Sequence, residues 1–230
     1  MDYAERYAKY RTEYAKEFVD YLYENVGLSN NSIIADIGSG TGKLSKQLLL
    51  KGSYVYSVEP NDNMRRVAEK DLSKFTKFLS INGTAESTTL QDSSVDFITV
   101  GTAFHWFDMA QFKKECQRIL RPNGKVILTW ISRPVNRNIN FEINFNGLSG
   151  GKEETPELIA PFYKNNSFEY KIFQEICSYT KETFIGRALS AFDKLTDSKY
   201  IDELSSLFDN HKVDETISIT LYTRSFAGQV

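Results

Sequence analysis

The sequence is poor in the residues that build disulfide frameworks and metal sites. Its 230 residues include two cysteines, Cys116 and Cys177, and two histidines, His105 and His211. The cysteines stand far apart with no Cys-x-x-Cys pair, and the histidines lack the short spacing that metal ligands share. The sequence therefore predicts free thiols in a reducing compartment and no metal site.

Long apolar runs and an excess of charge of either sign are also missing. No segment has the length and apolarity that span a bilayer, and Met1, Asp2 and Tyr3 open no signal peptide. The 28 Lys and Arg residues nearly balance the 30 Asp and Glu residues, and no basic run offers a footprint for phosphates. We therefore expect a cytoplasmic monomer or homodimer that binds neither membrane nor nucleic acid.

What the sequence does contain is a glycine-rich turn between two short apolar runs. Residues 33–37 predict a buried strand, residues 43–51 a helix and residues 54–58 a second strand, which ends on Glu59. The turn between the first strand and the helix carries glycine at three alternate positions, so it can adopt positive φ and let a ligand lie against the backbone. Such a strand–turn–helix–strand–acid unit is typical of sites for nucleotide-like ligands.

The spacing of this turn separates three ligand classes. A Walker loop needs Ser or Thr after Gly-Lys, but Leu44 follows Lys43, and Ile37 occupies the place of its first glycine. A dinucleotide fingerprint needs a third glycine where Lys43 stands, which weakens NAD(P) as a ligand without excluding it. The remaining pattern, Asp-x-Gly-x-Gly-x-Gly from Asp36, fits S-adenosyl-L-methionine. In that interpretation Asp36 takes the ligand ammonium group and Glu59 accepts both ribose hydroxyls.

Four motifs together resemble a known family. Asp36–Gly42, Val58-Glu59-Pro60, Gly83-Thr84-Ala85-Glu86 and Phe104-His105-Trp106-Phe107-Asp108 are similar to the class I S-adenosylmethionine-dependent methyltransferases of the methyltransferase-11 type, including the trans-aconitate methyltransferase-like group. The resemblance extends over residues 1–131. It implies an α/β, doubly wound, mostly parallel seven-stranded sheet with an antiparallel last strand, and methyl transfer to a small-molecule acceptor.

The resemblance also implies which residues bind the cofactor. Residues just after the ribose acid pack on the adenine, and the loop after the third strand closes its other side. Asn61 or Asp62 can cap the helix that follows. The implied cofactor set is Asp36, Gly38, Ser39, Gly40, Gly42, Glu59, Pro60, Asn61, Met64, Thr84, Ala85, Glu86, Gly101, Thr102 and Ala103.

The acceptor side is expected near the loop after the fourth strand, because ligands bind beyond the carboxyl ends of parallel strands. His105 either orients the acceptor or acts as a base, or it only pins the loop with Trp106 packed beneath it. A Tyr-rich helical segment, residues 1–26, bends near Arg11 and either covers the ligand as a flap or packs on the sheet. The candidate substrate pocket is Tyr7, Tyr10, Arg11, Phe104, His105 and Trp106.

We expect one methyltransferase domain over residues 1–230. It comprises the flap, a cofactor-binding core (32–131), an acceptor-side lid with scattered aromatic residues (132–167) and a segment that completes the sheet (168–230). Further strands are expected at 77–81, 95–100, 125–131, 168–179 and 216–226. Helices are expected at 64–72, 109–120, 181–195 and 198–208, and a turn at 121–124. Asp96, near the start of the fourth strand, is expected to be structural.

Methyl transfer from a sulfonium is an in-line displacement that needs alignment and exclusion of water more than acid–base groups. The sequence offers no compelling base, which favours an oxygen or nitrogen acceptor over a carbon acceptor. Two alternatives stay open: an NAD(P)-dependent oxidoreductase, and a protein that binds S-adenosylmethionine or its product without catalysis.

Overall fold

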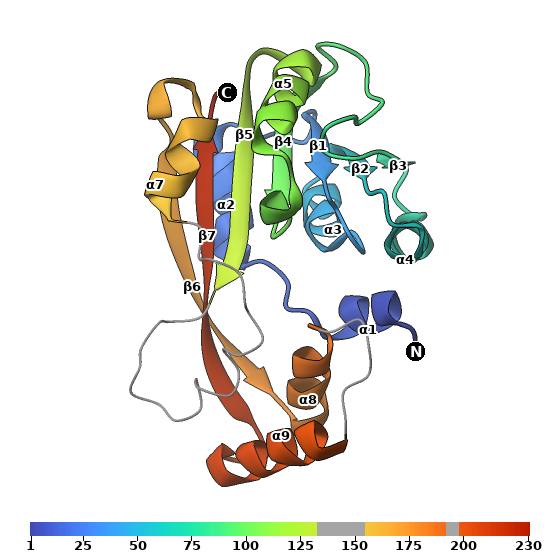
Figure 1. Cartoon of the computed structure of the whole chain (residues 1–230), viewed down its shortest axis with the longest axis vertical. Coiled ribbons are helices and arrows are strands. Elements are labelled where there is room, and N and C mark those ends of the chain that lie inside the picture. Colours follow the sequence, from blue (N-terminus) through green and yellow to red (C-terminus); the bar gives the residue numbers. More distant parts are fainter. Residues whose placement is uncertain (133–154, 192–197) are drawn as a thin grey trace. The chain divides into compact units, whose positions relative to one another are not determined.

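The computed structural model describes residues 1–132, 155–191 and 198–230, and its strands form a seven-stranded sheet (Figure 1). In space the strand order is β3-β2-β1-β4-β5-β7-β6. The chain thus builds outward from β1 to β3 and then returns to the other side of β1, which is the doubly wound arrangement that the sequence predicts. The strands are β1 (Ile33–Ile37), β2 (Tyr54–Val58), β3 (Phe78–Ile81), β4 (Val95–Gly101), β5 (Leu120–Ser132), β6 (Glu169–Tyr179) and β7 (Ile217–Gly228).

The first five strands are parallel and the last strands are antiparallel. β1 pairs with β2 and β4, so that Asp36 stands opposite Ser57 on one side and Thr99 on the other. β7 lies next to β5, where Thr129 Oγ1 donates a hydrogen bond of 2.9 Å to the carbonyl of Arg224. The order of strands reverses between β1 and β4, and open parallel sheets bind their ligands at the carboxyl side of that point.

The chain divides into two compact units, which are described separately. The first comprises Met1–Thr12, Ser132–Glu153 and Gln174–Tyr222, and the second comprises Glu13–Ile131, Glu154–Phe173 and Thr223–Val230. The helices are α1 (Tyr3–Tyr10), α2 (Lys16–Tyr21) continued by a π-helix (Leu22–Val26), α3 (Lys43–Leu50), α4 (Asp62–Leu72), α5 (Met109–Ile119), α7 (Pro156–Ile159), α8 (Lys181–Leu189) and α9 (Ser198–His211). Short 3₁₀ turns cover Phe104–Trp106, Ala160–Phe162 and Lys164–Asn166.

In the second unit the sheet is covered on both faces. One face packs against α2, α3 and α4, which contribute Phe18, Leu48 and Leu72 to a buried cluster. The other face packs against α5 and the turn after α7, with Phe112 and Phe162 fully buried. Because helices cover both faces of the sheet, both faces of β4 are packed against protein, and its sequence is almost continuously apolar.

Helix ends in the second unit follow local capping rules. The Asn61 side chain accepts hydrogen bonds from the backbone N–H groups of Asn63 and Met64 and caps α4. Asp108 accepts from the N–H of Gln111 and caps α5, as the sequence predicts. Both caps stand directly after loops that end at the carboxyl edge of the sheet, so they also fix where those loops stop.

Several boundaries differ from the sequence predictions. The expected turn at 121–124 is part of β5, which starts at Leu120 and shifts register where Val95 and Phe97 pair with it. The helix expected over 181–195 ends as α8 at Leu189. The error at 121–124 arises because Pro-Asn-Gly is a turn signal that an irregular strand pairing also accommodates.

The expected flap and lid are only partly described. The helix breaks at the predicted place, since α1 ends at Tyr10 and α2 starts at Lys16, and the division into units falls between them. Of the expected lid, residues 133–154 lie outside the described residues. In the remainder, Phe162 and Tyr163 are almost fully buried in the core of the second unit.

The first unit brings α1, α8 and α9 together. The Tyr10 ring packs so closely on Gly186 that a Cβ there would lie 2.5 Å from it, and Lys9 Nζ pairs with Glu182 at 2.9 Å. α8 packs on α9 through the rings of Phe184 and Phe208, whose centroids are 5.8 Å apart. No helix in the described part of the chain combines the length and apolarity that crossing a bilayer requires.

Candidate functional site

The carboxyl ends of β1, β2 and β4 bring the predicted cofactor residues together within the second unit. The glycine turn after β1 has left-handed backbone at Gly38 (φ +64°), Gly40 (φ +57°) and Gly42 (φ +78°). The N–H groups of Gly38 and Ser39 donate to the carbonyl of Val58, at 2.9 and 3.2 Å. The turn is therefore bound to the last residue of β2.

The three glycines serve different purposes. A Cβ at Gly38 would lie 2.8 Å from the Cβ of Ala103, and one at Gly42 would lie 2.6 Å from Leu72 Cδ1. A Cβ at Gly40 would meet nothing within 4 Å. The absence of a side chain at Gly38 lets the loop after β4 pack against the turn, and the absence of one at Gly42 lets α4 do so. Gly40 borders open space. Gly42 is therefore needed for helix packing and Gly40 leaves room for a ligand, while the predicted contact of Gly42 with the cofactor stays a prediction.

Asp36 is the fourth residue of β1, just before the turn. Its side chain is almost fully buried, Oδ2 accepts from Ser45 Oγ at 2.6 Å, and Oδ1 accepts from Thr99 Oγ1 at 2.9 Å. Burial raises the pKa of Asp36 to about 6, although both hydrogen bonds act in the opposite direction. The carboxylate thus joins β1 to α3 and β4, and its predicted contact with a ligand ammonium group stays a prediction.

Glu59 stands where β2 ends and holds the turn from the other side. Its Oε2 accepts from the N–H of Gly40 at 2.8 Å, and its Oε1 accepts from the N–H of Asn61 at 2.9 Å. The Glu59 carbonyl also accepts from Arg65 Nη1 at 3.0 Å. Each carboxylate oxygen has a further lone pair, so this fixed carboxylate can accept two more hydrogen bonds from vicinal hydroxyls.

The residues expected around the adenine differ in exposure. Pro60 and Asn61 are exposed, Met64 is half-buried, and Ala85 is buried in the core. Thr84, in the loop after β3, is exposed as well.

Glu86 crosses to the loop after β4. Its Oε1 accepts from the N–H of Asp108 at 3.0 Å, so the loop after β3 is tied to the residue that caps α5. Contacts of Glu86 and of the residues around it with an adenine stay predictions.

The loop after β4 is fixed at its first residues. Thr102 has left-handed backbone (φ +56°), and its N–H donates to the carbonyl of Thr129 at 2.8 Å. The hydroxyls of Thr102 and Tyr14 share a hydrogen bond of 3.1 Å, and the Tyr14 ring closes on Gly101. Tyr14 was not among the predicted site residues, although in the sequence it continues the three- and four-residue spacing of Tyr7 and Tyr10. Its position directly after the break at Arg11 is the only sequence signal.

Phe104, His105 and Trp106 form a 3₁₀ turn and point in different directions. Phe104 is buried, with its ring centroid 5.0 Å from Phe162 and 6.1 Å from Phe112. His105 is exposed and Trp106 is 81% exposed, with their ring centroids 5.1 Å apart. The expectation that Trp106 packs beneath the loop is therefore wrong, and Phe104 is the residue that anchors it.

Tyr7, Tyr10 and Arg11 belong to the first unit. The Arg11 guanidinium lies over the Tyr7 ring, 5.0 Å from its centroid, and the Tyr10 hydroxyl donates to Glu182 at 2.9 Å. Their contact with an acceptor stays a prediction. Within the described residues, no group of three or more His, Cys, Asp and Glu side chains could hold a metal ion.

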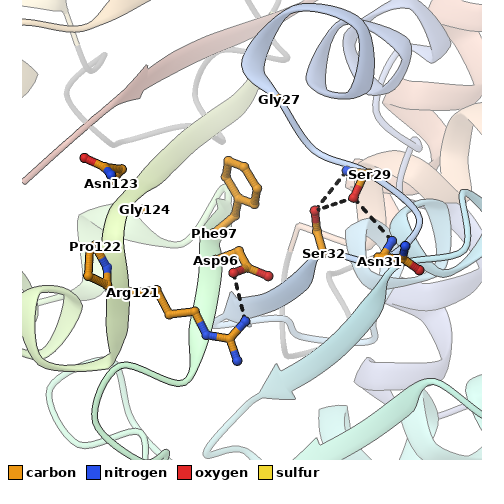
Figure 2. Close-up of a pocket in the computed structure, with 10 residues that line it drawn as sticks. All are labelled: Gly27, Ser29, Asn31, Ser32, Asp96, Phe97, Arg121, Pro122, Asn123 and Gly124. Atoms are coloured by element: carbon orange, nitrogen blue, oxygen red, sulfur yellow. Dashed lines mark hydrogen bonds and ion pairs between the residues drawn. The ribbon is translucent and has the colours of Figure 1, made fainter.

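A cavity of about 340 Å³ lies at the opposite edge of the sheet, at the amino ends of β1 and β4 (Figure 2). There Asp96 Oδ1 accepts from Arg121 Nη1 at 2.9 Å, and Oδ2 accepts from the N–H of Ile33 at 2.8 Å. These bonds join the starts of β1, β4 and β5, which confirms the structural role predicted for Asp96. The cavity is lined by Gly27, Ser29, Asn31, Ser32, Asp96, Phe97, Arg121, Pro122, Asn123 and Gly124.

The part of the chain that carries the glycine turn is similar to known proteins. Residues 35–128 match the sequence model of a type 11 family described as "Methyltransferase domain". This part of the chain is similar to that family. The match runs from within β1 into β5 and includes every candidate residue from Asp36 to Trp106.

Proteins similar to this part of the chain include uncharacterized methyltransferases. One from Mycobacterium tuberculosis is 36% identical over 127 residues, which cover 55% of this chain and 49% of that protein. One from Schizosaccharomyces pombe is 31% identical over 125 residues, covering 54% and 49%. The chain thus spans about half the length of the curated relatives it matches.

Solved structures share the fold at low sequence identity. A candidate type II methyltransferase from Anaeromyxobacter dehalogenans aligns with a TM-score of 0.72 at 20% identity, covering 95% of this chain and 97% of that one. A phosphoethanolamine N-methyltransferase from Haemonchus contortus, in complex with phosphomonomethylethanolamine and S-adenosylhomocysteine, aligns with a TM-score of 0.60 at 16% identity, covering 99% and 57%. The fold is therefore the Rossmann-like fold of methyltransferases, as the sequence predicts.

The buried carboxyl of Asp36 makes stability depend on pH. Its pKa is about 6 in the folded chain against an ordinary 3.8, so its contribution to the free energy of unfolding is full below the lower value and is lost as pH rises through the upper one. The loss amounts to about 3 kcal/mol. Urea denaturation of Asp36→Asn should lack this decline between about pH 4 and about pH 6. Asp71→Asn, which changes an exposed aspartate, should keep the decline in stability. An equal decline in both variants would contradict the assignment of this pH dependence to Asp36.

The glycines of the turn should respond differently to alanine. Both Gly40→Ala and Gly42→Ala force left-handed backbone on a residue with a Cβ, at about 1–2 kcal/mol. Gly42→Ala also crowds Leu72 and should cost about 1–3 kcal/mol more in the free energy of unfolding, measured in urea. Equal stability of the two variants would show that α4 shifts to accept the methyl group.

Proposed function

We propose that this chain is an S-adenosyl-L-methionine-dependent methyltransferase that transfers a methyl group to a small-molecule acceptor by in-line displacement. The observation that carries the proposal is the pairing of the Glu59 carboxylate with the open space beside Gly40. A fixed acceptor of hydrogen bonds at the end of the second strand, next to backbone without side chains, suits a ribose whose attached groups lie along the turn.

The residues present fit this cofactor. Glu59 would accept from the two ribose hydroxyls, and the backbone beside Gly40 leaves room for the ligand to lie along the turn. The start of α3 carries the positive end of the helix dipole, which favours a carboxylate. S-adenosylhomocysteine bound to the Haemonchus contortus enzyme of the same fold supports the choice. When bound, S-adenosyl-L-methionine supplies an electrophilic methyl group on a sulfonium.

The residues of the chain contribute alignment and exclusion of water. Thr102 is held from two sides, by Thr129 and by Tyr14, and the end of the same loop is held by Glu86 through Asp108. A loop fixed at both ends can orient an acceptor reproducibly, which is the main requirement of a displacement that neutralises charge.

His105 is the exposed titratable side chain within this fixed loop. It can hold a proton of the acceptor or accept one, and neither role is needed when the acceptor is a carboxylate or a free amine. An oxygen or nitrogen acceptor is accordingly the form of the reaction that these residues suit.

Calorimetry on the full chain tests the cofactor. We expect S-adenosylhomocysteine to bind, and Glu59→Ala to weaken that binding by about 1–3 kcal/mol through lost charge-assisted hydrogen bonds. Glu24→Ala, an exposed glutamate of the same unit, should bind like the wild type. Tight binding of NAD⁺ or NADP⁺ with no heat from S-adenosylhomocysteine would favour an oxidoreductase and refute the proposal.

Transfer of a radiolabelled methyl group to a panel of metabolites tests catalysis and the role of His105. His105→Ala should bind S-adenosylhomocysteine nearly as the wild type does, while its turnover falls by about tenfold or more. His211→Ala, which changes the other histidine, should keep both properties. If the wild type transfers no methyl group to any acceptor, binding without catalysis becomes the better description; full turnover of His105→Ala would remove only the proton-transfer role.

A further inference from the structure

Two arginine side chains meet inside the first unit, and one comes from a helix that the sequence did not connect with any site. Arg187 projects from α8 and is 8% exposed. Its Nε donates to Thr12 Oγ1 at 2.9 Å, and its guanidinium lies 5.9 Å from the centroid of the Tyr179 ring. The Tyr179 and Thr12 hydroxyls share a hydrogen bond of 2.9 Å.

The second arginine, Arg11, follows the last residue of α1. Its N–H closes the helix on the carbonyl of Tyr7, so its side chain starts at a fixed point. The guanidinium lies over the Tyr7 ring, and its Nε is buried without a hydrogen-bond partner. Buried N–H groups of native proteins are almost always paired, and one that is not indicates that a group which completes the site is missing.

The two positive charges influence each other. Burial lowers the pKa of Arg187, and the charge of Arg11 acts in the same direction. Glu182 of the same unit pairs with Lys9 and accepts from Tyr10, and Cys177 Sγ donates to Glu175 at 3.7 Å.

Neither guanidinium forms an ion pair with a carboxylate in the described part of the chain. A guanidinium stays charged at any accessible pH, so the buried Arg187 beside the half-buried Arg11 is costly in free energy unless an anion neutralises the two charges.

We propose that Arg11 and Arg187 form a binding site for a small oxyanion, the carboxylate or phosphate group of a ligand. The forked donors of a guanidinium match the oxygens of such a group in pairs, and the hydroxyls of Thr12 and Tyr179 lie beside them. The Arg11 guanidinium lies over the Tyr7 ring, and the Arg187 guanidinium lies over the Tyr179 ring. The site is built within the first unit and goes beyond the proposed function, since it requires no methyl donor.

Titration of the full chain with inorganic phosphate and, separately, with succinate tests the site. The ionic strength is held constant with chloride, and binding is followed by the ¹H–¹⁵N signals of the arginine Nε–H groups. We expect saturable shifts at Arg11 and Arg187 with at least one of the two anions. The anion with the higher affinity then shows whether the site prefers a phosphate or a carboxylate group. Absence of saturable shifts with both anions would overturn the proposal.

Matched variants separate the site from general charge effects. Arg11→Gln and Arg187→Gln should each weaken anion binding by about tenfold or more, whereas Arg11→Lys should retain part of it. Lys9→Gln removes a cation from the same contact between α1 and α8 and should bind like the wild type. Unchanged affinity in Arg11→Gln would also overturn the proposal.

Binding of S-adenosylhomocysteine by each variant, which concerns the second unit alone, shows that the chain is folded. It also keeps this test distinct from that of the methyltransferase activity. If the anion binds and S-adenosylhomocysteine does not, the proposed function fails while the anion site stands.

Discussion

The buried carboxylate of Asp36 is the constraint on which the rest of the second unit depends. It accepts from Ser45 on α3 and from Thr99 on β4, so one side chain joins the first strand, the helix that follows it and the neighbouring strand. A carboxylate in the protein interior is costly unless it is hydrogen-bonded, and here the donors come from elements that must be correctly placed to reach it. The direction in which the chain leaves β1 is fixed by this requirement.

Given that direction, the glycine turn can meet Glu59. Glu59 accepts from Gly40 and Asn61 and thus joins the turn to the start of α4, one strand away from Asp36. The two acids stand at equivalent places in the sequence, each at or near the end of a strand. Both are buried, and their hydrogen-bond partners divide their roles: Asp36 accepts from side chains of α3 and β4, and Glu59 accepts from backbone N–H groups at the carboxyl edge of the sheet, where ligands bind.

What the sequence predicts well is what short-range physics determines. Alternation, apolar runs and glycine spacing are properties of neighbouring residues, so the parallel strands, the turn after Ile37 and the caps Asn61 and Asp108 were predictable. Contacts between distant residues were not. The partners of Asp36, the hydrogen bond from Tyr14 to Thr102 and the meeting of Arg187 with Arg11 depend on packing that no local pattern encodes. The exposure of Trp106 is of the same kind, because Phe104 occupies the core position that either ring could have filled.

The charges of Asp36 and Glu59 connect the scaffold with the space beside the turn. Burial raises the pKa of Asp36, and the negative charge of Glu59 adds a smaller effect in the same direction. The two carboxylates therefore interact across the glycine turn. A positive charge brought to the turn stabilises the ionised form of Asp36 by the reciprocal effect, and a neutral ligand does not. Under the proposed function, a sulfonium at the turn would lower the pKa of Asp36 in this way, and the neutral thioether of the product would not. Such an effect would need no side chain over the reacting atoms, only an acid that is buried close to another.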